Sequence, residues 1–319
     1  MNSNLYLLNR MGDDNYLSVI VVDNKRKRFL RNAVNSIINQ TLHRDRYEII
    51  AVINYDDEEI ISWLLNHQVS VIRTNEENGG ALYAKGIKES TGEVLVFLDD
   101  DDMLVSNKLE YVNKTFLERA DLGFLHNNVI LIDELEHTIS CSQNDEFKHY
   151  ACAKNYRDKI YVRNSDISVM LGNLISKTPR RDPFFYLGFN SSSISVRRGL
   201  PINYLDKLHR LNFAQDNLHF LEALMSDYSI MHDPLPLTYY RIHGSSFTQM
   251  DHAIMGQRIY NDYSIISGIG KKYLADLEID IDLCEIAAWM PMLRYAILNM
   301  DVFLTIKAAF GLFKNKVKM

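Results

Sequence analysis

Val94-Leu95-Val96-Phe97-Leu98-Asp99-Asp100-Asp101-Asp102 joins five apolar residues directly to four carboxylates. The apolar run follows the turn residue Gly92 and predicts a strand buried on both faces of a parallel sheet. Open α/β sheets bind their ligands at the C-terminal ends of such strands. Four adjacent acids repel one another, so we expect a cation there. Carboxylate oxygens suit Mg²⁺ or Mn²⁺ that carries phosphates. The alternative is a solvated acidic turn that caps the next helix.

Strands and helices alternate along the first hundred residues. Continuous apolar runs predict the strands, and apolar residues at helical spacing predict the segments between them. The expected strands cover 17–22, 47–53, 69–72 and 94–98, and the expected helices cover 29–41, 56–65 and 81–90. This alternation indicates βαβ units. The predicted fold class is therefore α/β, with a Rossmann-like, mostly parallel sheet flanked by helices.

The second half of the chain has a less regular pattern. A helix is expected over 107–119, a strand over 123–133, a strand over 189–196, a helix over 217–225 and the last sheet segment over 229–241. Residues 140–182 show no clear period, and a stretch of that length in a compact domain is typical of a functional loop or lid that sets acceptor choice. From residue 251 the pattern is helical. We therefore predict a domain over 1–250 and a C-terminal helical extension over 251–319.

Composition restricts the class of protein. The 319 residues carry a net charge of −6, which argues against a nucleic-acid partner. The three cysteines, Cys141, Cys152 and Cys284, have neither metal-ligand spacing nor a disulfide pattern, which fits a reducing cytosol. Residues 1–16 contain no apolar core of signal-peptide length, and no apolar run is long enough to span a bilayer. We expect a cytoplasmic protein, or one peripheral at the inner face of the membrane.

An ordered set of blocks resembles the nucleotide-sugar-dependent glycosyltransferases of family 2, which have the GT-A fold. Phe97-Leu98-Asp99-Asp100-Asp101-Asp102 is similar to the Asp-x-Asp-Asp motif of that family. Gln215-Asp216 resembles the motif that carries its catalytic base, and Tyr239-Tyr-Arg-Ile-His-Gly-Ser-Ser246 resembles the block that closes its active site. The remaining blocks are 18–26 with 29–30 and 36–41, then 48–52, 78–80, 84–87 and 91–93. The resemblance covers residues 17–250, with a nucleotide-binding half over 17–105 and an acceptor half over 106–250.

The chain departs from the family at positions that contact the nucleotide in that family. The family has Pro-Thr-Tyr-Asn after the first strand, whereas this chain has Val22-Asp23-Asn24-Lys25. The paired acids after the second strand are replaced by Ile53 and Asn54, and an Arg-Asn pair is replaced by Lys85-Gly86. A lysine keeps the positive charge but lacks the planar fork of arginine. A UDP-sugar is the favoured donor, although these departures leave the identity of the nucleotide base undetermined.

The resemblance implies a role for each matching residue. Asp101 is the candidate ligand of Mn²⁺ or Mg²⁺, His243 is a candidate further ligand or a contact to the diphosphate, and Asp216 is the candidate catalytic base. The candidate nucleotide-sugar contacts are Asp23, Asn54, Asn78, Lys85, Asp99, Asp100, Arg241 and Ser245. Each has a structural alternative: an Asp at position 216 also suits a helix N-cap, a lone histidine is commonly structural, and Asn78 to Gly80 also suit the start of a helix.

The predicted function is a metal-dependent, inverting glycosyltransferase that moves a sugar from a nucleoside diphosphate to a hydroxyl of a glycan or lipid-linked sugar. A degenerate member that binds nucleotide or carbohydrate without turnover is the non-enzyme alternative. A nucleotidyltransferase would have glycines near the first strand, and a dinucleotide-dependent oxidoreductase would have G-x-G-x-x-G there, but residues 21–28 contain no glycine. The apolar, terminally basic segment 286–319 suits packing on the core, contact with a membrane surface, or a homodimer contact.

Overall fold

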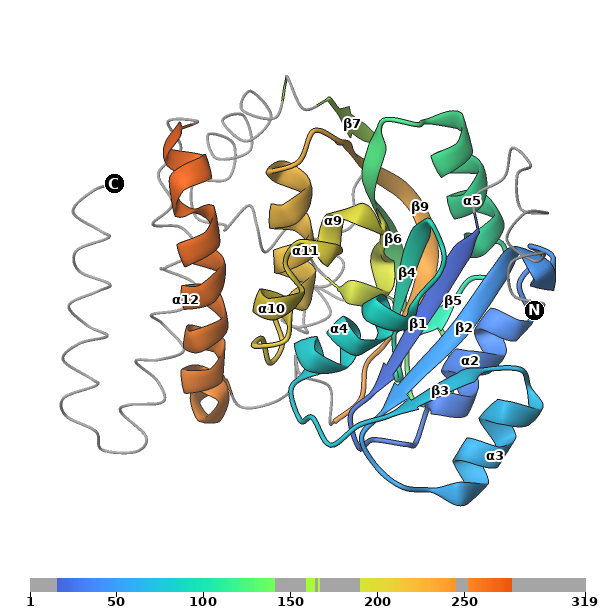
Figure 1. Cartoon of the computed structure of the whole chain (residues 1–319). Coiled ribbons are helices and arrows are strands. Elements are labelled where there is room, and N and C mark those ends of the chain that lie inside the picture. The colour runs from blue at the N-terminus through green and yellow to red at the C-terminus, as the bar shows by residue number, and fades with distance from the viewer. Residues whose placement is uncertain (1–15, 141–158, 164–165, 167–189, 245–251, 277–319) are drawn as a thin grey trace, which may run out of the picture.

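The computed structural model describes residues 16–140, 159–163, 166, 190–244 and 252–276. These residues form one sheet of nine strands with helices on both faces (Figure 1). The strand order is β3-β2-β1-β4-β8-β6-β9-β5, and β7 pairs with β9 outside this path. The α/β architecture predicted from the alternation of strands and helices is confirmed.

The first half of the sheet is parallel. It contains β1 (Leu17–Asp23), β2 (Tyr47–Ile53), β3 (Ser70–Arg73) and β4 (Val94–Asp99). Strand β1 lies between β2 and β4, with Val22 opposite both Val52 and Asp99. All seven residues of β1 are buried, because both faces of the strand are covered by helices. These strands all end at one edge of the sheet, where the acids follow β4.

The second half of the sheet is mixed. It contains β5 (Met103–Leu104), β6 (Leu122–Ile132), β7 (Ile160–Val162), β8 (Ile194–Arg197) and β9 (Ser229–Arg241). β4 is therefore parallel to β1 on one side and antiparallel to β8 on the other. The expected strand over 189–196 is also wrong for 191–193, which form a 3₁₀ turn; residue 189 lies outside the described residues.

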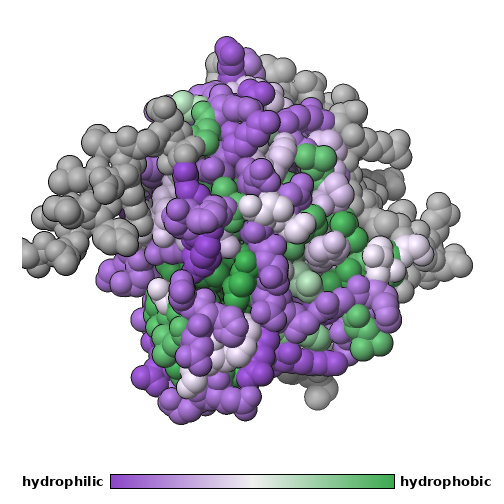
Figure 2. Space-filling view, turned by 90° about the vertical axis from the view of Figure 1, so that its right-hand side faces the viewer, coloured by the Kyte–Doolittle hydropathy of each residue, from purple (hydrophilic) through white to green (hydrophobic). Residues whose placement is uncertain are grey.

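Two layers of helices cover the sheet (Figure 1). One face carries α2 (Leu30–Ile38), α3 (Glu58–Asn66) and α5 (Lys108–Glu118). The other carries α4 (Gly79–Glu89), α9 (Gly199–Ile202), α10 (Leu205–Leu208) and α11 (Gln215–Leu224). Alternate residues of β1 point into the two cores, with Val19 and Val21 in one and Ile20 and Val22 in the other. The face over α2, α3 and α5 is mostly hydrophilic (Figure 2).

Helix α12 (His252–Asp276) lies beside α11 (Figure 1). Its buried side chains Ile259, Tyr263 and Ile266 join the same core as α4 and α11. Asp262 of α12 is fully buried, and its carboxylate accepts hydrogen bonds from the backbone of 212–214. None of the described helices is long and apolar enough to cross a bilayer. The expected helices after residue 276 lie outside the described residues, and the domain boundary at 250 stays a prediction.

Candidate active site

The acids that follow β4 form a compact cluster at the edge of the sheet. One carboxylate oxygen from each of Asp99, Asp101 and Asp102 lies within 4.8 Å of the others. Asp100 is fully buried, and Asp101 and Asp102 are 8% and 1% exposed. The solvated acidic turn that the sequence left open is therefore excluded. Three converging carboxylates form the kind of oxygen donor set that a hard divalent cation binds.

The side chains of Arg26 and His243 converge on a single oxygen of Asp101. His243, which follows β9, places Nε2 2.9 Å from Asp101 Oδ2. The guanidinium of Arg26 donates to the same oxygen and also to Asp100, with Nε 2.9 Å from Asp100 Oδ1. Asp101 and His243, the two predicted metal ligands, are thus neighbours in the fold. Their ligand roles stay a prediction.

Arg26 was not predicted from the sequence. It occupies a turn in which both Lys25 (φ 63°) and Lys27 (φ 58°) adopt the left-handed conformation that side chains disfavour. The Asp23 carboxylate accepts hydrogen bonds from the backbone N–H groups of Arg26 and Lys27. The hydroxyl of Tyr55 also donates to Asp23. Asp23, predicted to contact the nucleotide, therefore holds the turn that directs Arg26 toward the acids.

Burial and mutual repulsion shift the pKa values of the acids apart. Burial, followed by the charge of Asp101, raises the pKa of Asp99 to about 6. Burial also raises the pKa values of Asp100 and Asp102 above the usual range. Burial opposes ionisation of Asp101 as well, but Arg26 and His243 outweigh it and lower its pKa. A divalent cation at this cluster would lower the raised pKa values of Asp99, Asp100 and Asp102, because positive charge favours the ionised carboxylates.

Asp102 connects the cluster to the interior of the protein. Its Oδ1 accepts the backbone N–H of Arg241 at 2.9 Å, whereas its buried Oδ2 has no hydrogen-bond partner among the described residues. Behind it the fully buried amine of Lys108 donates to Ser192 O and to Thr238 Oγ1. Burial lowers the pKa of Lys108 to about 7, although the charge of Asp102 acts in the opposite direction. No sequence signal pointed to Lys108, which begins an ordinary amphipathic helix.

Asp216 lies in the first turn of α11. Its carboxylate accepts the backbone N–H of Asn190 at 3.0 Å and that of Asn217 at 2.8 Å. Its negative charge contributes to the raised pKa of Asp99. Asp99 also accepts a hydrogen bond from the Tyr83 hydroxyl at 2.8 Å. The N-cap position belongs to Ala214, so the N-cap alternative for Asp216 is wrong.

Arg241 is buried and directed away from the surface. Its side chain is 0% exposed, and Nε donates to the backbone oxygen of Asp101 at 2.8 Å. Nη1 donates to the backbone oxygen of Asp133 at 3.0 Å. The guanidinium also stacks on Phe29, 4.5 Å from the ring centroid. Arg241 therefore fixes the acidic turn against neighbouring backbone, and its predicted contact with the donor stays a prediction.

The other predicted donor contacts lie on separate elements. Asn54 is buried after β2, where its amide nitrogen donates to Asn24 Oδ1 and Glu76 O. Asn78 is the N-cap of α4 and lines a cavity beside α12, so the helix-start alternative for this segment is confirmed. Lys85 is half-buried on α4. Ser245 lies outside the described residues, as do residues 141–158, 164–165 and 167–182 of the expected lid.

Comparison with known proteins identifies the class of fold first. The structure resembles that of Staphylococcus aureus TarS residues 1–349 in complex with UDP-GlcNAc, with a TM-score of 0.59 and 13% identity over 94% of this chain and 81% of that one. The same fragment in complex with UDP gives a TM-score of 0.54. The sheet and its helices therefore have the GT-A fold.

The sequence is similar to glycosyltransferases over part of its length. Residues 18–167 match the family description of glycosyl transferase family 2. An uncharacterized glycosyltransferase of Nostoc sp. is 32% identical over 39% of this chain and 39% of its own length, and one of Rickettsia bellii is 32% identical over 38% and 18%. The poly(ribitol-phosphate) beta-N-acetylglucosaminyltransferase TarS of Staphylococcus aureus is 27% identical over 36% and 20%. The chain thus spans less than half of these relatives' lengths. Residues 18–167 are therefore similar to the family 2 glycosyltransferases.

Proposed function

We propose that this protein is a metal-dependent, inverting glycosyltransferase that uses a UDP-sugar. The observation that carries the proposal is that one short segment contacts both Asp216 and Asp99: the Asp216 carboxylate accepts the backbone N–H of Asn190 at 3.0 Å, and Ser192 Oγ accepts the backbone N–H of Asp99 at 3.0 Å. A base and a metal-phosphate site must lie close together, because the reacting anomeric carbon is bonded to the phosphate. The family match and the UDP-sugar bound by a structural neighbour support the same reaction.

Asp216 acts as the general base in this proposal. Its carboxylate takes the proton of the acceptor hydroxyl as that oxygen attacks the anomeric carbon of the donor. The new carbon–oxygen bond forms as the bond from the anomeric carbon to the phosphate oxygen breaks, and the nucleoside diphosphate leaves with the electron pair. Attack from the face opposite the leaving group inverts the configuration. The backbone N–H groups of Asn190 and Asn217 hold the carboxylate in a fixed position for this transfer.

The cation is assigned to Asp101 together with Asp99 and Asp102. A bound Mn²⁺ or Mg²⁺ would neutralise the diphosphate as it leaves. His243 orients Asp101 by its contact with Oδ2 or serves as a further ligand. The unpaired Oδ2 of the buried Asp102 is an additional oxygen donor in the same place. The carboxylates thus supply donors of the right chemical type, and Arg241 keeps the turn in position from behind.

Two variants test the two parts of this mechanism. We expect Asp216→Asn to bind UDP with Mn²⁺ as the wild type does, but to lose at least roughly 100-fold of donor turnover, which is the lower range for general-base catalysis. Asp101→Asn should instead lose the Mn²⁺-dependent rise in melting temperature on UDP binding. Donor turnover is measured as UDP released from UDP-GlcNAc and other UDP-sugars. Unchanged turnover in Asp216→Asn would exclude it as the base, and wild-type binding without any turnover would favour the degenerate binder.

A further inference from the structure

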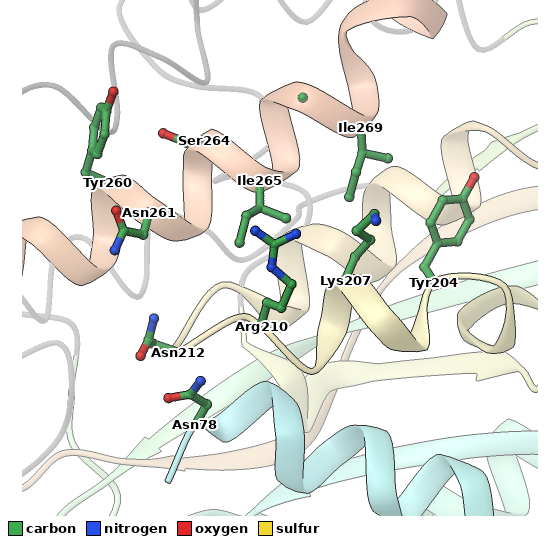
Figure 3. A pocket seen from close by; sticks show the side chains of 11 residues that line it. Asn78, Tyr204, Lys207, Arg210, Asn212, Tyr260, Asn261, Ser264, Ile265 and Ile269 are labelled. Atoms are coloured by element: carbon green, nitrogen blue, oxygen red, sulfur yellow. The ribbon is translucent and has the colours of Figure 1, made fainter. Parts of the chain in front are cut away.

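A second concave site lies between helix α12 and the turn that follows α10 (Figure 3). The cavity has a volume of about 1010 Å³, which is at the upper end of the range for small-ligand pockets and leaves room for more than one sugar ring. Asn78 and Asn212 line it on the side of α4, and α12 forms the opposite wall. Among the described residues of the sequence-derived site, Asn78 alone lines this cavity.

Positive charge is concentrated in this cavity. Lys207 and Arg210 extend from the α10 turn toward α12 (Figure 3). The described lining contains no acidic side chain, and Arg210 has no ion pair among the described residues. Lys207 lies 2.7 Å from Asp206, whose 68% exposed carboxylate is outside the lining. His209, on the same turn, pairs with Glu76 and is also outside it. In a protein with a net charge of −6, the described lining of this cavity thus carries only cationic charged side chains.

The remaining lining is mixed: Ile265, Gly268 and Ile269 of α12 contribute apolar surface, and the other residues can contact a polyhydroxylated ligand. Tyr260 and Tyr204 lie toward opposite ends of the cavity (Figure 3), where aromatic faces can cover sugar rings. Side-chain amides and a hydroxyl that can bind hydroxyl groups come from Asn78, Asn212, Asn261 and Ser264. Cations in the middle with amides around them favour a chain that bears both hydroxyls and anionic groups.

The cavity is coupled to the candidate base through the backbone. Asp262 lies on α12 next to the lining residue Asn261, and its fully buried carboxylate accepts the N–H groups of Asn212, Phe213 and Ala214 at 2.7–3.2 Å. These residues directly precede Gln215 and Asp216. The same carboxylate therefore joins the two walls of the cavity and fixes the start of the helix that carries the base.

We propose that this cavity binds an anionic carbohydrate or polyol chain and is the acceptor subsite of the enzyme. The acceptor role of the cavity rests on the proposed transferase function. Its preference for an anionic chain does not depend on that function and can be tested by binding alone. The shared chemistry is a phosphate or carboxylate on a polyhydroxylated chain. Charge-assisted hydrogen bonds from Lys207 and Arg210 hold the anionic group, and the acceptor hydroxyl is thereby brought toward Asp216.

Calorimetric titration tests the proposal with three probes: trigalacturonate, glucose 6-phosphate and uncharged maltotriose. We expect at least one anionic probe to bind more tightly than maltotriose, with an affinity that falls as NaCl is raised. The double variant Lys207→Gln/Arg210→Gln should weaken that probe at least tenfold. The double variant Arg31→Gln/Lys114→Gln makes the same change in net charge on exposed side chains of α2 and α5, and should stay within twofold of the wild type.

The donor provides the second comparison. Binding of UDP with Mn²⁺ should be unchanged in Lys207→Gln/Arg210→Gln, and the anionic probe should still bind when UDP and Mn²⁺ are saturating. The proposal is overturned if no anionic probe binds better than maltotriose, if the two double variants behave alike, or if UDP displaces the probe. Failure of UDP to bind the wild type would instead reject the proposed function, and the anionic titration would still report on the cavity.

Discussion

His243 Nε2 lies 2.9 Å from Asp101 Oδ2 across a separation of 142 residues along the chain. The contact joins the end of β9 to the acid turn after β4, so the two ends of the proposed metal site are brought together only by the sheet. Both side chains are nearly buried, with exposures of 1% and 11%. The histidine therefore fixes the carboxylate that carries the most firmly held charge of the cluster.

Replacing His243 by alanine should weaken divalent-cation binding. Loss of a side chain that ligates a metal or orients a ligand typically lowers metal affinity about 10–100-fold. Mn²⁺ titration followed by electron paramagnetic resonance measures the change. His43→Ala is the matched control, because His43 pairs with Asp45 on the surface and is 82% exposed. Equal Mn²⁺ affinities in the wild type and His243→Ala would remove His243 from the site.

Arg26→Ala should make the cluster depend on a metal for stability. The Arg26 guanidinium lies against Asp100, which is 0% exposed, and against Asp101. Its loss leaves buried carboxylates unpaired, which should lower the free energy of unfolding by up to about 3 kcal/mol. This is the lower end of the range for breaking a buried ion pair, and we use it because the Arg26 side chain is 30% exposed. Mn²⁺ should then raise the melting temperature of Arg26→Ala more than that of the wild type. In the variant, Mn²⁺ no longer competes with the Arg26 guanidinium for the carboxylates.

Arg31→Ala controls for the removal of an arginine. It breaks a pair with Glu59 in which both side chains are exposed, and such pairs contribute about 0–1 kcal/mol. Its melting temperature should respond to Mn²⁺ as the wild type does. A Mn²⁺ response that is the same in Arg26→Ala and Arg31→Ala would show that Arg26 and the cation do not share the cluster.

The sequence predicted the acids of this site but not Arg26. A local residue pattern defines the strand and its acids, whereas the position of Arg26 depends on the geometry of a turn. The strand and its acids are local features: five apolar residues before Asp99 define a buried strand whatever surrounds it. The place of Arg26 depends on a turn with Lys25 and Lys27 in the left-handed region, and nothing in a run of four basic residues indicates that conformation. Side chains whose direction is set by turn geometry therefore could not be placed from the sequence.

The burial of two charged side chains, Lys108 and Arg241, also could not be predicted from the sequence. Lys108 precedes Leu109 at the start of an amphipathic helix and would be placed in solvent, yet it is 0% exposed beneath Asp102. Arg241, whose predicted contact with the donor stays a prediction, is 1% exposed and hydrogen-bonds the backbone of Asp101 and Asp133, a burial that the sequence did not indicate. In both cases the partners lie on distant strands or turns, and only the mixed pairing of β8, β6 and β9 brings them together.

The buried Lys108 predicts a pH dependence of stability. Its pKa is about 7 in the fold, against 10.5 for an exposed lysine, so the unfolded chain binds more protons between these values. The contribution of Lys108 is therefore most favourable above pH 10.5 and is lost as the pH falls toward 7. The difference in unfolding free energy between wild type and Lys108→Met should rise with pH over this window in urea titrations. Lys114→Met, an exposed change on the same helix, should show no such slope.

Gly80→Ala should destabilise the protein, although alanine favours helices over glycine by roughly 0.5–1 kcal/mol. Gly80 lies in the first turn of α4 and donates its N–H to Leu211 O at 3.1 Å. A Cβ there would lie 2.1 Å from Leu208 O and 2.9 Å from Leu211 O, so the α10 turn must move. Overpacking of this kind costs about 1–3 kcal/mol. Because that turn leads to Gln215 and Asp216, UDP release should fall as well.

Gly199→Ala provides the opposite case for the same substitution. Gly199 is the first residue of α9, and a Cβ at this position would meet no atom within 4 Å. Its unfolding free energy in urea should stay within about 0.5 kcal/mol of the wild type, as for most substitutions without a buried contact. Equal stabilities for the two variants would mean that α4 and the α10 turn are not in the close contact described, and the link from α4 to the base at Asp216 would have to be abandoned.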